Sequence, residues 1–158
     1  MNILGVDPGA SGALAVIRDG GMYDVVDMPV GLVTVGKSTR RRIVPELLAQ
    51  ELWELLPLDA AYVEEVASMP RQGVSSVFTF GQAHGLILGA LTALRVPVRR
   101  VRPVAWQTKV KAKGDPRPRA LELYPTLAPQ LKRKKDEGRA DAALIAHYGY
   151  LMEKENGN

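Results

Sequence analysis

Cysteine is absent from this chain of 158 residues, and histidine occurs only twice. The lack of cysteine excludes disulfides and thiolate metal sites, which suits the reducing cytoplasm where we expect the protein to reside. With so few histidines, any catalytic metal has to be bound mainly by oxygen ligands. Oxygen-rich sites favour Mg²⁺, with Mn²⁺ as an alternative, over zinc.

Charged residues are missing from residues 72–94, a stretch long enough to span a bilayer. Its polar residues include Ser75, Ser76, Thr79, Gln82, His84 and Thr92. We therefore expect a buried helix of a soluble protein, with no membrane partner. Gly81, Gly85 and Gly89 recur at every fourth position, so on a helix they form a smooth stripe that another backbone can approach closely. We expect this stripe either to pack on a sheet or to form a dimer contact.

Basic residues are in excess, with a net charge of +4 and a sequence pI of about 9.5. They gather in residues 40–42, 95–119 and 132–135. Basic clusters on one surface are typical of a protein that binds a polyanion such as nucleic acid. Each cluster taken alone is equally consistent with a solvated, solubilising surface.

Apolar periodicity predicts an α/β protein whose mixed sheet begins with an antiparallel N-terminal hairpin and is covered by helices. The expected strands are residues 3–7, 12–17, 23–28, 60–66 and 98–101. The expected helices are residues 45–56, 75–94, 104–109, 119–124 and 139–153. Residues 30–42 are expected to form a polar, basic loop. We expect a single domain over residues 1–154, with a frayed tail at residues 155–158.

Several carboxylates stand where burial would be costly without a partner or a metal. Asp7 ends the first strand, and Glu64 and Glu65 lie in the fourth. Asp141 begins the last helix, with Glu137 one turn before it. Because strand side chains alternate, only one of the two adjacent glutamates can share a face with the first-strand acid. Carboxylates from distant segments could then converge at one end of the sheet, as a two-metal phosphodiesterase requires.

Each acid also has a purely structural interpretation. Asp7 can hold a turn with Pro8 and Gly9. Glu65 is expected to be the solvent-facing member of its pair, and Asp136 can cap the last helix. Their joint placement, rather than any one of them, therefore points to catalysis.

Four segments, in order, resemble the RuvC family of Holliday junction resolvases, especially its short phage-type members. Residues 5–9 (GVDPG), followed by Gly12, resemble the first catalytic strand. Residues 62–66 (YVEEV) resemble the second acidic motif. Residues 74–85 (VSSVFTFGQAHG) are similar to the helix that follows, and residues 139–146 (RADAALIA) to the C-terminal acidic helix. These segments span nearly the whole chain.

The resemblance implies a ribonuclease H-like fold, with a five-stranded mixed sheet flanked by helices. It also implies a homodimer that makes paired incisions in branched DNA, above all in four-way junctions. Two Mg²⁺ ions are expected, with Asp7, Glu64 and Asp141 as catalytic residues and metal ligands.

The chain departs from the family pattern at two places. The fourth acid of the family usually lies a turn before the last one, but the position three residues before it is Gly138 here. Glu137 is therefore the expected fourth catalytic residue and metal ligand, with Asp136 in reserve. Many members carry an aromatic wedge after the second acidic motif, where this chain has residues 67–69 (ASM). Met69 is the expected DNA contact at that point.

The basic stretch of residues 95–119 corresponds to the region that contacts DNA phosphates in the family. The resemblance therefore implies four DNA-binding residues: Lys109, Lys113, Arg117 and Arg119. Trp106, in the same stretch, could stack on a base, although a core or helix-capping role is the commoner one for a lone tryptophan.

A competing motif lies at residues 31–38 (GLVTVGKS), which match the P-loop pattern of nucleotide-binding ATPases. The helix that this motif requires would carry Pro45 in its interior and would bear arginines where apolar residues are needed. Two further alternatives keep the fold: a junction-binding module without catalysis, which the intact acidic set argues against, and a related nuclease that acts on flaps or hybrids.

Overall fold

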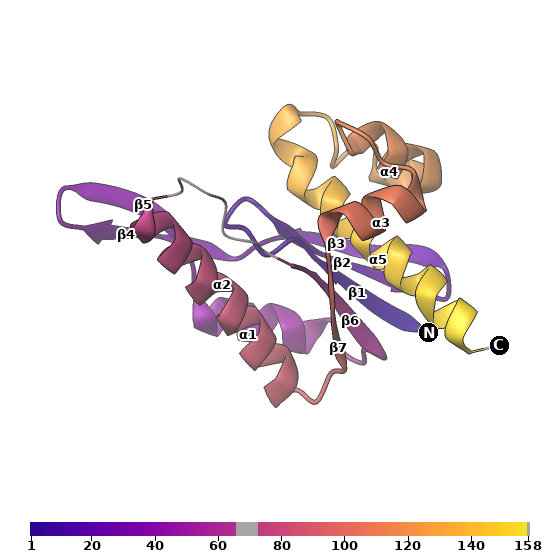
Figure 1. The fold of residues 1–158 in the computed structure, drawn as a ribbon, viewed down its shortest axis with the longest axis horizontal. Coiled ribbons are helices and arrows are strands. Elements are labelled where there is room, and N and C mark those ends of the chain that lie inside the picture. Colours follow the sequence, from indigo (N-terminus) through magenta and orange to yellow (C-terminus); the bar gives the residue numbers. More distant parts are fainter. Residues whose placement is uncertain (66–72, 158) are drawn as a thin grey trace.

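The computed structural model describes residues 1–65 and 73–157, and a five-stranded sheet lies at its centre (Figure 1). In spatial order the strands are β3 (Gly21–Asp27), β2 (Ala13–Arg18), β1 (Asn2–Val6), β6 (Ala60–Glu64) and β7 (Val98–Val101). The β1–β2 and β2–β3 pairs are antiparallel, whereas β1–β6 and β6–β7 are parallel. The predicted mixed sheet of an α/β fold is thereby confirmed.

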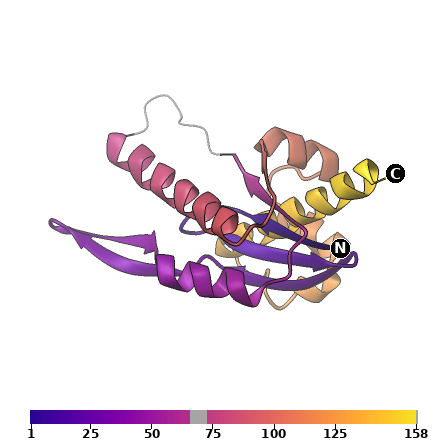
Figure 2. The same ribbon diagram turned by 90° about the horizontal axis from the view of Figure 1, so that it is seen from below.

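Helices cover both faces of this sheet (Figure 2). One face carries α1 (Pro45–Glu54) and α2 (Val74–Ala93). The other carries α3 (Pro103–Val110), α4 (Arg117–Leu123) and α5 (Glu137–Asn156), with short 3₁₀ turns at Pro125–Leu127 and Lys134–Asp136. Helix α5 continues to Asn156, so residues 155 and 156 of the expected tail belong to its last turn.

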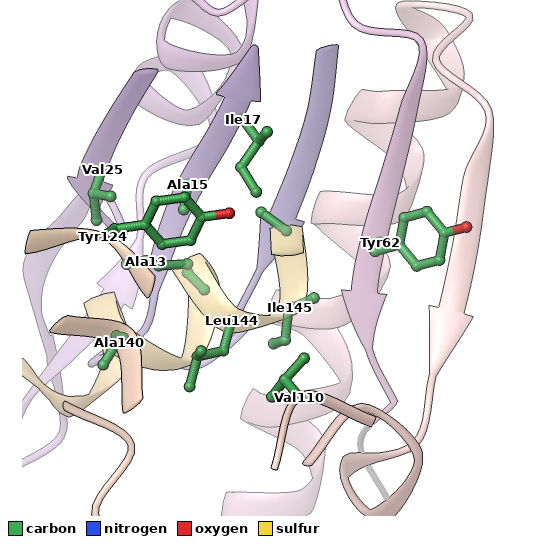
Figure 3. Close-up of a cluster of buried hydrophobic side chains, with 14 of the residues drawn as sticks. Ala13, Ala15, Ile17, Val25, Tyr62, Val110, Tyr124, Ala140, Leu144 and Ile145 are labelled. Carbon is green, nitrogen blue, oxygen red and sulfur yellow. The ribbon is translucent and has the colours of Figure 1, made fainter. Parts of the chain in front are cut away.

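Strand alternation divides the core into two layers. On the α5 face, Ile3, Ala15 and Tyr62 belong to one buried cluster with Leu144 and Ile145 (Figure 3). On the α1–α2 face, a second cluster contains Leu4, Val16, Val63, Leu52 and Leu91. Odd-numbered residues of β1 and even-numbered residues of β6 therefore face α5.

Gly5 explains how closely α5 approaches the central strand. A Cβ atom at Gly5 would overlap the backbone nitrogen of Ala146 and the carbonyl oxygen of Ala142. The helix backbone therefore rests directly on β1, which only glycine allows at this contact. This close contact fixes the first turns of α5 near the end of β1.

The predicted loop at residues 30–42 is wrong, because β4 (Val30–Val35) and β5 (Ser38–Ile43) form an antiparallel hairpin. Its β-branched residues favour extended backbone even though few of its side chains reach a core. The P-loop interpretation fails for the same reason. The matching segment forms a strand and a tight turn at Gly36, whose φ is +62°, whereas a phosphate-binding loop opens a helix.

Helix α2 is far less buried than predicted. Only Ile87 and Leu91 of its residues are buried, because its N-terminal half extends beyond the sheet and lies beside β5 (Figure 1). Arg40 and Arg42 of β5 donate hydrogen bonds to Ser75 Oγ and Gln82 Oε1 there, at 3.0 and 3.2 Å. By length and composition alone, α2 could cross a membrane, but one such helix among the described residues is weak support for a span.

Candidate active site

Asp7 follows the last residue of β1, in a tight turn. Its backbone N–H still donates to the carbonyl of Ala13 at 3.1 Å, and Gly9 N–H donates to its Oδ1 at 3.3 Å. A Cβ atom at Gly12 would overlap the carbonyl oxygen of Asp7, so the return of the chain requires glycine. Asp7 can therefore hold this turn and still present its carboxylate at the end of the sheet.

The two adjacent glutamates diverge after β6. Glu64 lies on the α5 face and accepts a hydrogen bond from the indole Nε1 of Trp106 at 2.8 Å. Burial raises the pKa of Glu64, and the hydrogen bond from Trp106 opposes that rise. Glu65 forms an ion pair with Arg102 at 3.8 Å and is more than a third exposed. The structure therefore brings Glu64, not Glu65, to the side of Asp7.

Glu65→Gln should consequently retain most of the activity of the protein, since its carboxylate points away from the acidic group and its exposed ion pair contributes little. The measurement is the rate of nicking of branched DNA, the activity that the sequence predicts, compared with that of Glu64→Gln. An inactive Glu65→Gln beside an active Glu64→Gln would reverse the assignment of the two residues.

Asp141 lies in the second turn of α5 and completes a group of three carboxylates. Its pKa rises to about 8 because it is largely buried and because Asp7, Glu64 and Glu137 add negative charge nearby. The pKa of Asp7 rises to about 6, through burial and then through the charge of Glu64. Asp7 and Asp141 line one cavity, and the negative charge of Glu64 raises the pKa of both acids.

The fourth acid can be chosen between Asp136 and Glu137. Asp136 is buried, and its carboxylate accepts hydrogen bonds from the backbone N–H and guanidinium of Arg133, with distances from 2.8 Å. These bonds hold the pKa of Asp136 at about 2. Both Asp136 and Glu137 line the same cavity as Asp7 and Asp141, but the oxygens of Asp136 are committed to hydrogen bonds within this turn. The arrangement favours Glu137.

Gly138 shows why no acid stands three residues before Asp141. A Cβ atom at this position would overlap the carbonyl oxygen of Ser11 and would lie 3.2 Å from Oδ2 of Asp7. The turn after β1 therefore packs directly against the start of α5. An aspartate at residue 138 would require this turn to move.

A cavity of about 430 Å³ opens beside these acids. Its acidic lining is Asp7, Asp27, Asp136, Glu137 and Asp141, and its basic lining is Arg41, Arg133, Lys134 and Lys135. The sequence showed residues 132–135 only as a cluster of charge. Their position at the acidic site follows from the 3₁₀ turn that leads into α5, which local periodicity does not reveal.

The four predicted DNA-binding cations have different environments. Lys109 pairs with Glu155 at 2.6 Å, and Arg117 pairs with Asp115. Arg119 donates to the carbonyl of Val110 at 2.7 Å and pairs with Glu122. Lys113 is exposed and forms no ion pair with any described residue. Met69 lies outside the described residues.

The site fits a divalent cation in charge and in ligand chemistry. Three partly buried carboxylates with raised pKa values repel one another, and a bound cation relieves that repulsion. In residues 1–65 and 73–157, no three acidic or histidine side chains are already close enough to enclose one ion. Binding therefore requires rotation of these side chains toward a common centre.

Comparison with known proteins gives the family. No protein-family model matches the chain. The crossover junction endodeoxyribonuclease RuvC of Chloroflexus aggregans is 33% identical over 155 residues, which cover 92% of this chain and 90% of that relative. RuvC of Carboxydothermus hydrogenoformans is 25% identical over 159 residues, or 96% of each chain.

Solved structures show the same fold. T. thermophilus RuvC in complex with Holliday junction substrate matches with a TM-score of 0.62 at 18% identity, over 97% of this chain and 96% of that one. A second Thermus thermophilus RuvC structure matches with a TM-score of 0.56 at 16% identity, over 97% of both chains. The predicted ribonuclease H-like fold is thereby confirmed. Given this fold and the 33% identity to the Chloroflexus protein, the chain belongs to the RuvC family of crossover junction endodeoxyribonucleases.

Proposed function

We propose that this protein resolves four-way (Holliday) DNA junctions by paired, metal-dependent hydrolysis of phosphodiester bonds. The observation that carries the proposal is an acidic group in a chain of the RuvC family: Asp7 and Asp141 line a cavity that also carries basic residues, and the charge of Glu64 acts on both of these acids. The names of its relatives support the reaction, and the Holliday junction substrate bound to T. thermophilus RuvC supports the choice of DNA.

The metal site would consist of Asp7, Glu64 and Asp141, with Glu137 as the fourth ligand. RuvC enzymes are metal-dependent in general, and an all-oxygen ligand set supports Mg²⁺ here. A pair of such ions would supply a polarised phosphate and an activated water. The chain itself contributes the backbone positions from which these carboxylates would reach the ion, and β1, β6 and α5 set those positions.

DNA backbone binding is assigned to the cations around the site. Lys134 and Lys135 line the cavity and form no ion pair with any described residue. Lys113, in the basic stretch of residues 95–119, is exposed. The ion pairs of Lys109, Arg117 and Arg119 would have to be exchanged for contacts with phosphate. Lys134 and Lys135 are therefore the stronger candidates for contacts with phosphates close to the cleaved bond.

Replacing Lys134 and Lys135 together with alanine should weaken junction binding and reduce its salt dependence. Because each phosphate contact releases condensed counterions, the slope of log affinity against log salt should fall by about 2 units. Lys154→Ala is the matched control, since Lys154 lies near the far end of α5 beside Tyr150. An unchanged slope in the double variant would exclude these two lysines from the DNA interface.

The homodimer is proposed to form through α2. A Cβ atom at Gly81, Gly85 or Gly89 would meet no described atom within 4 Å, so the glycine stripe does not pack on the sheet. Phe78 and Val74, one and two turns before the stripe, are 63% and 86% exposed. An apolar stripe with a smooth centre supports close approach of a second α2 helix.

Gly85→Leu should therefore yield a monomer that nicks junctions singly rather than in symmetric pairs, because the added side chain keeps the two helices apart. The measurement combines the mass in solution with mapping of both nicks on one junction. Ala49→Leu, which adds a leucine at an exposed position of α1, should remain dimeric. A Gly85→Leu protein that stays dimeric would contradict the α2 interface. A monomeric one that still makes symmetric pairs of nicks would contradict the link between the dimer and paired incision.

The decisive test of the function uses a synthetic four-way junction with Mg²⁺, beside a flap, an RNA–DNA hybrid and a linear duplex of the same sequence. We expect paired nicks at symmetric positions in the junction and much slower cutting of the others. Faster cutting of the flap or the hybrid would assign the same active site to that substrate instead.

A further inference from the structure

Trp106 is the residue whose position the proposed reaction leaves unexplained. It lies in α3, is 1% exposed, and belongs to the same buried cluster as Val101, Val110 and Ile145. A ring so enclosed cannot stack on a base, which excludes that sequence-based alternative. Its indole Nε1 donates to Oε1 of Glu64 at 2.8 Å.

The chemistry of this hydrogen bond is directional. The indole N–H can only donate, so it needs an acceptor, and a buried ring has few orientations available. In the part of the chain that the structure describes, Trp106 is the one side chain that donates to the carboxylate of Glu64. The bond occupies Oε1 of the carboxylate, and no described residue donates to Oε2.

We propose that Trp106 is a positioning residue for the metal site: its indole N–H fixes the carboxylate of Glu64 so that Oε2 is presented to the ion. This inference rests on the proposed metal-dependent reaction and adds a residue to it. Hydrogen bonds to ligating carboxylates set their orientation, and losing one costs about 10-fold or more in metal affinity.

The carboxylates differ in how they are held, which explains why Glu64 needs this support. Asp7 lies in a turn braced by Gly9 and Gly12, and its side chain is short. Glu64 has one more rotatable bond than Asp7 and stands at the end of β6. A donor from α3 supplies the constraint that β6 alone does not.

The test measures Mn²⁺ affinity directly by calorimetry, without DNA, in four proteins: the wild type, Trp106→Phe, Glu64→Gln and the double variant. Trp106→Phe should lose about 10-fold in affinity in the wild-type background and nothing further in the Glu64→Gln background. Equal losses in both backgrounds would overturn the proposal, because the tryptophan would then act on the site through packing alone. Trp53→Phe is the matched control, since Trp53 is 68% exposed on α1.

A second replacement separates the hydrogen bond from the volume of the ring if Trp106→Phe unfolds. In the Trp53→Phe protein, the remaining tryptophan can be exchanged for benzothienylalanine, which keeps the bicyclic shape and lacks the N–H. An unchanged melting temperature with weakened Mn²⁺ binding is expected, and unchanged Mn²⁺ binding would overturn the proposal. Because no DNA is present, these results are independent of whether junctions are the substrate.

Discussion

Replacing Asp7 or Asp141 with asparagine, or Glu64 with glutamine, is expected to reduce junction cleavage by about 1,000-fold or more. Each change keeps the shape of the side chain and removes one negative charge from a metal site worth several kcal/mol of transition-state stabilisation. Junction affinity should stay within a few-fold, because it depends on the basic residues around the site. The measurements are single-turnover cleavage with Mg²⁺ and binding in its absence.

Glu65→Gln serves as the matched control, because it removes the same charge one residue away on the opposite side of the strand. The cleavage rate of Glu137→Gln should lie between that of Glu65→Gln and that of Glu64→Gln. Asp136→Asn should lower the stability of the protein rather than its metal binding, since Asp136 accepts hydrogen bonds from Arg133. Cleavage at the wild-type rate by the Asp7, Glu64 or Asp141 variant would remove that residue from the catalytic group.

Strand alternation made much of the site predictable. The apolar pattern predicted the five strands, and the period of two showed that only one of Glu64 and Glu65 can share a face with Asp7. The family resemblance, not the period, selected Glu64. Asp141 followed from its place at the start of an apolar helix. What the pattern could not reveal was the tight contact of Gly5 and Gly138 with neighbouring backbone, which sets how near the carboxylates lie.

The failures have a common physical cause, which is that they depend on partners distant in sequence. Residues 38–43 are rich in arginine, yet they form a strand because β4 pairs with them. The α2 helix is apolar enough for a core, yet its N-terminal half lies beyond the sheet.

Asp141→Asn is expected to stabilise the metal-free protein at pH 8 while abolishing its activity. The pKa of Asp141 is about 8 in the folded protein and near 3.8 when unperturbed. Between these values the folded protein holds a proton that the unfolded chain has released, so the free energy of unfolding falls as pH rises. Asparagine cannot ionise, so the Asp141→Asn protein does not suffer this decrease in the free energy of unfolding. The decrease is worth about 2 kcal/mol after allowance for solvent screening.

The melting temperature in EDTA should therefore be similar for the two proteins at pH 4.5 and about 5 °C higher for Asp141→Asn at pH 8. Asp115→Asn is the control: hydrogen bonds from Arg117 lower the pKa of Asp115, so its removal should bring no gain at high pH. Adding Mg²⁺ at pH 8 should raise the melting temperature of the wild type and leave that of Asp141→Asn nearly unchanged, because the cation stabilises the ionised carboxylates only where the full set is present. A wild-type melting temperature independent of pH from 4.5 to 8 would contradict the repulsion among Asp7, Glu64 and Asp141 on which metal binding is proposed to depend.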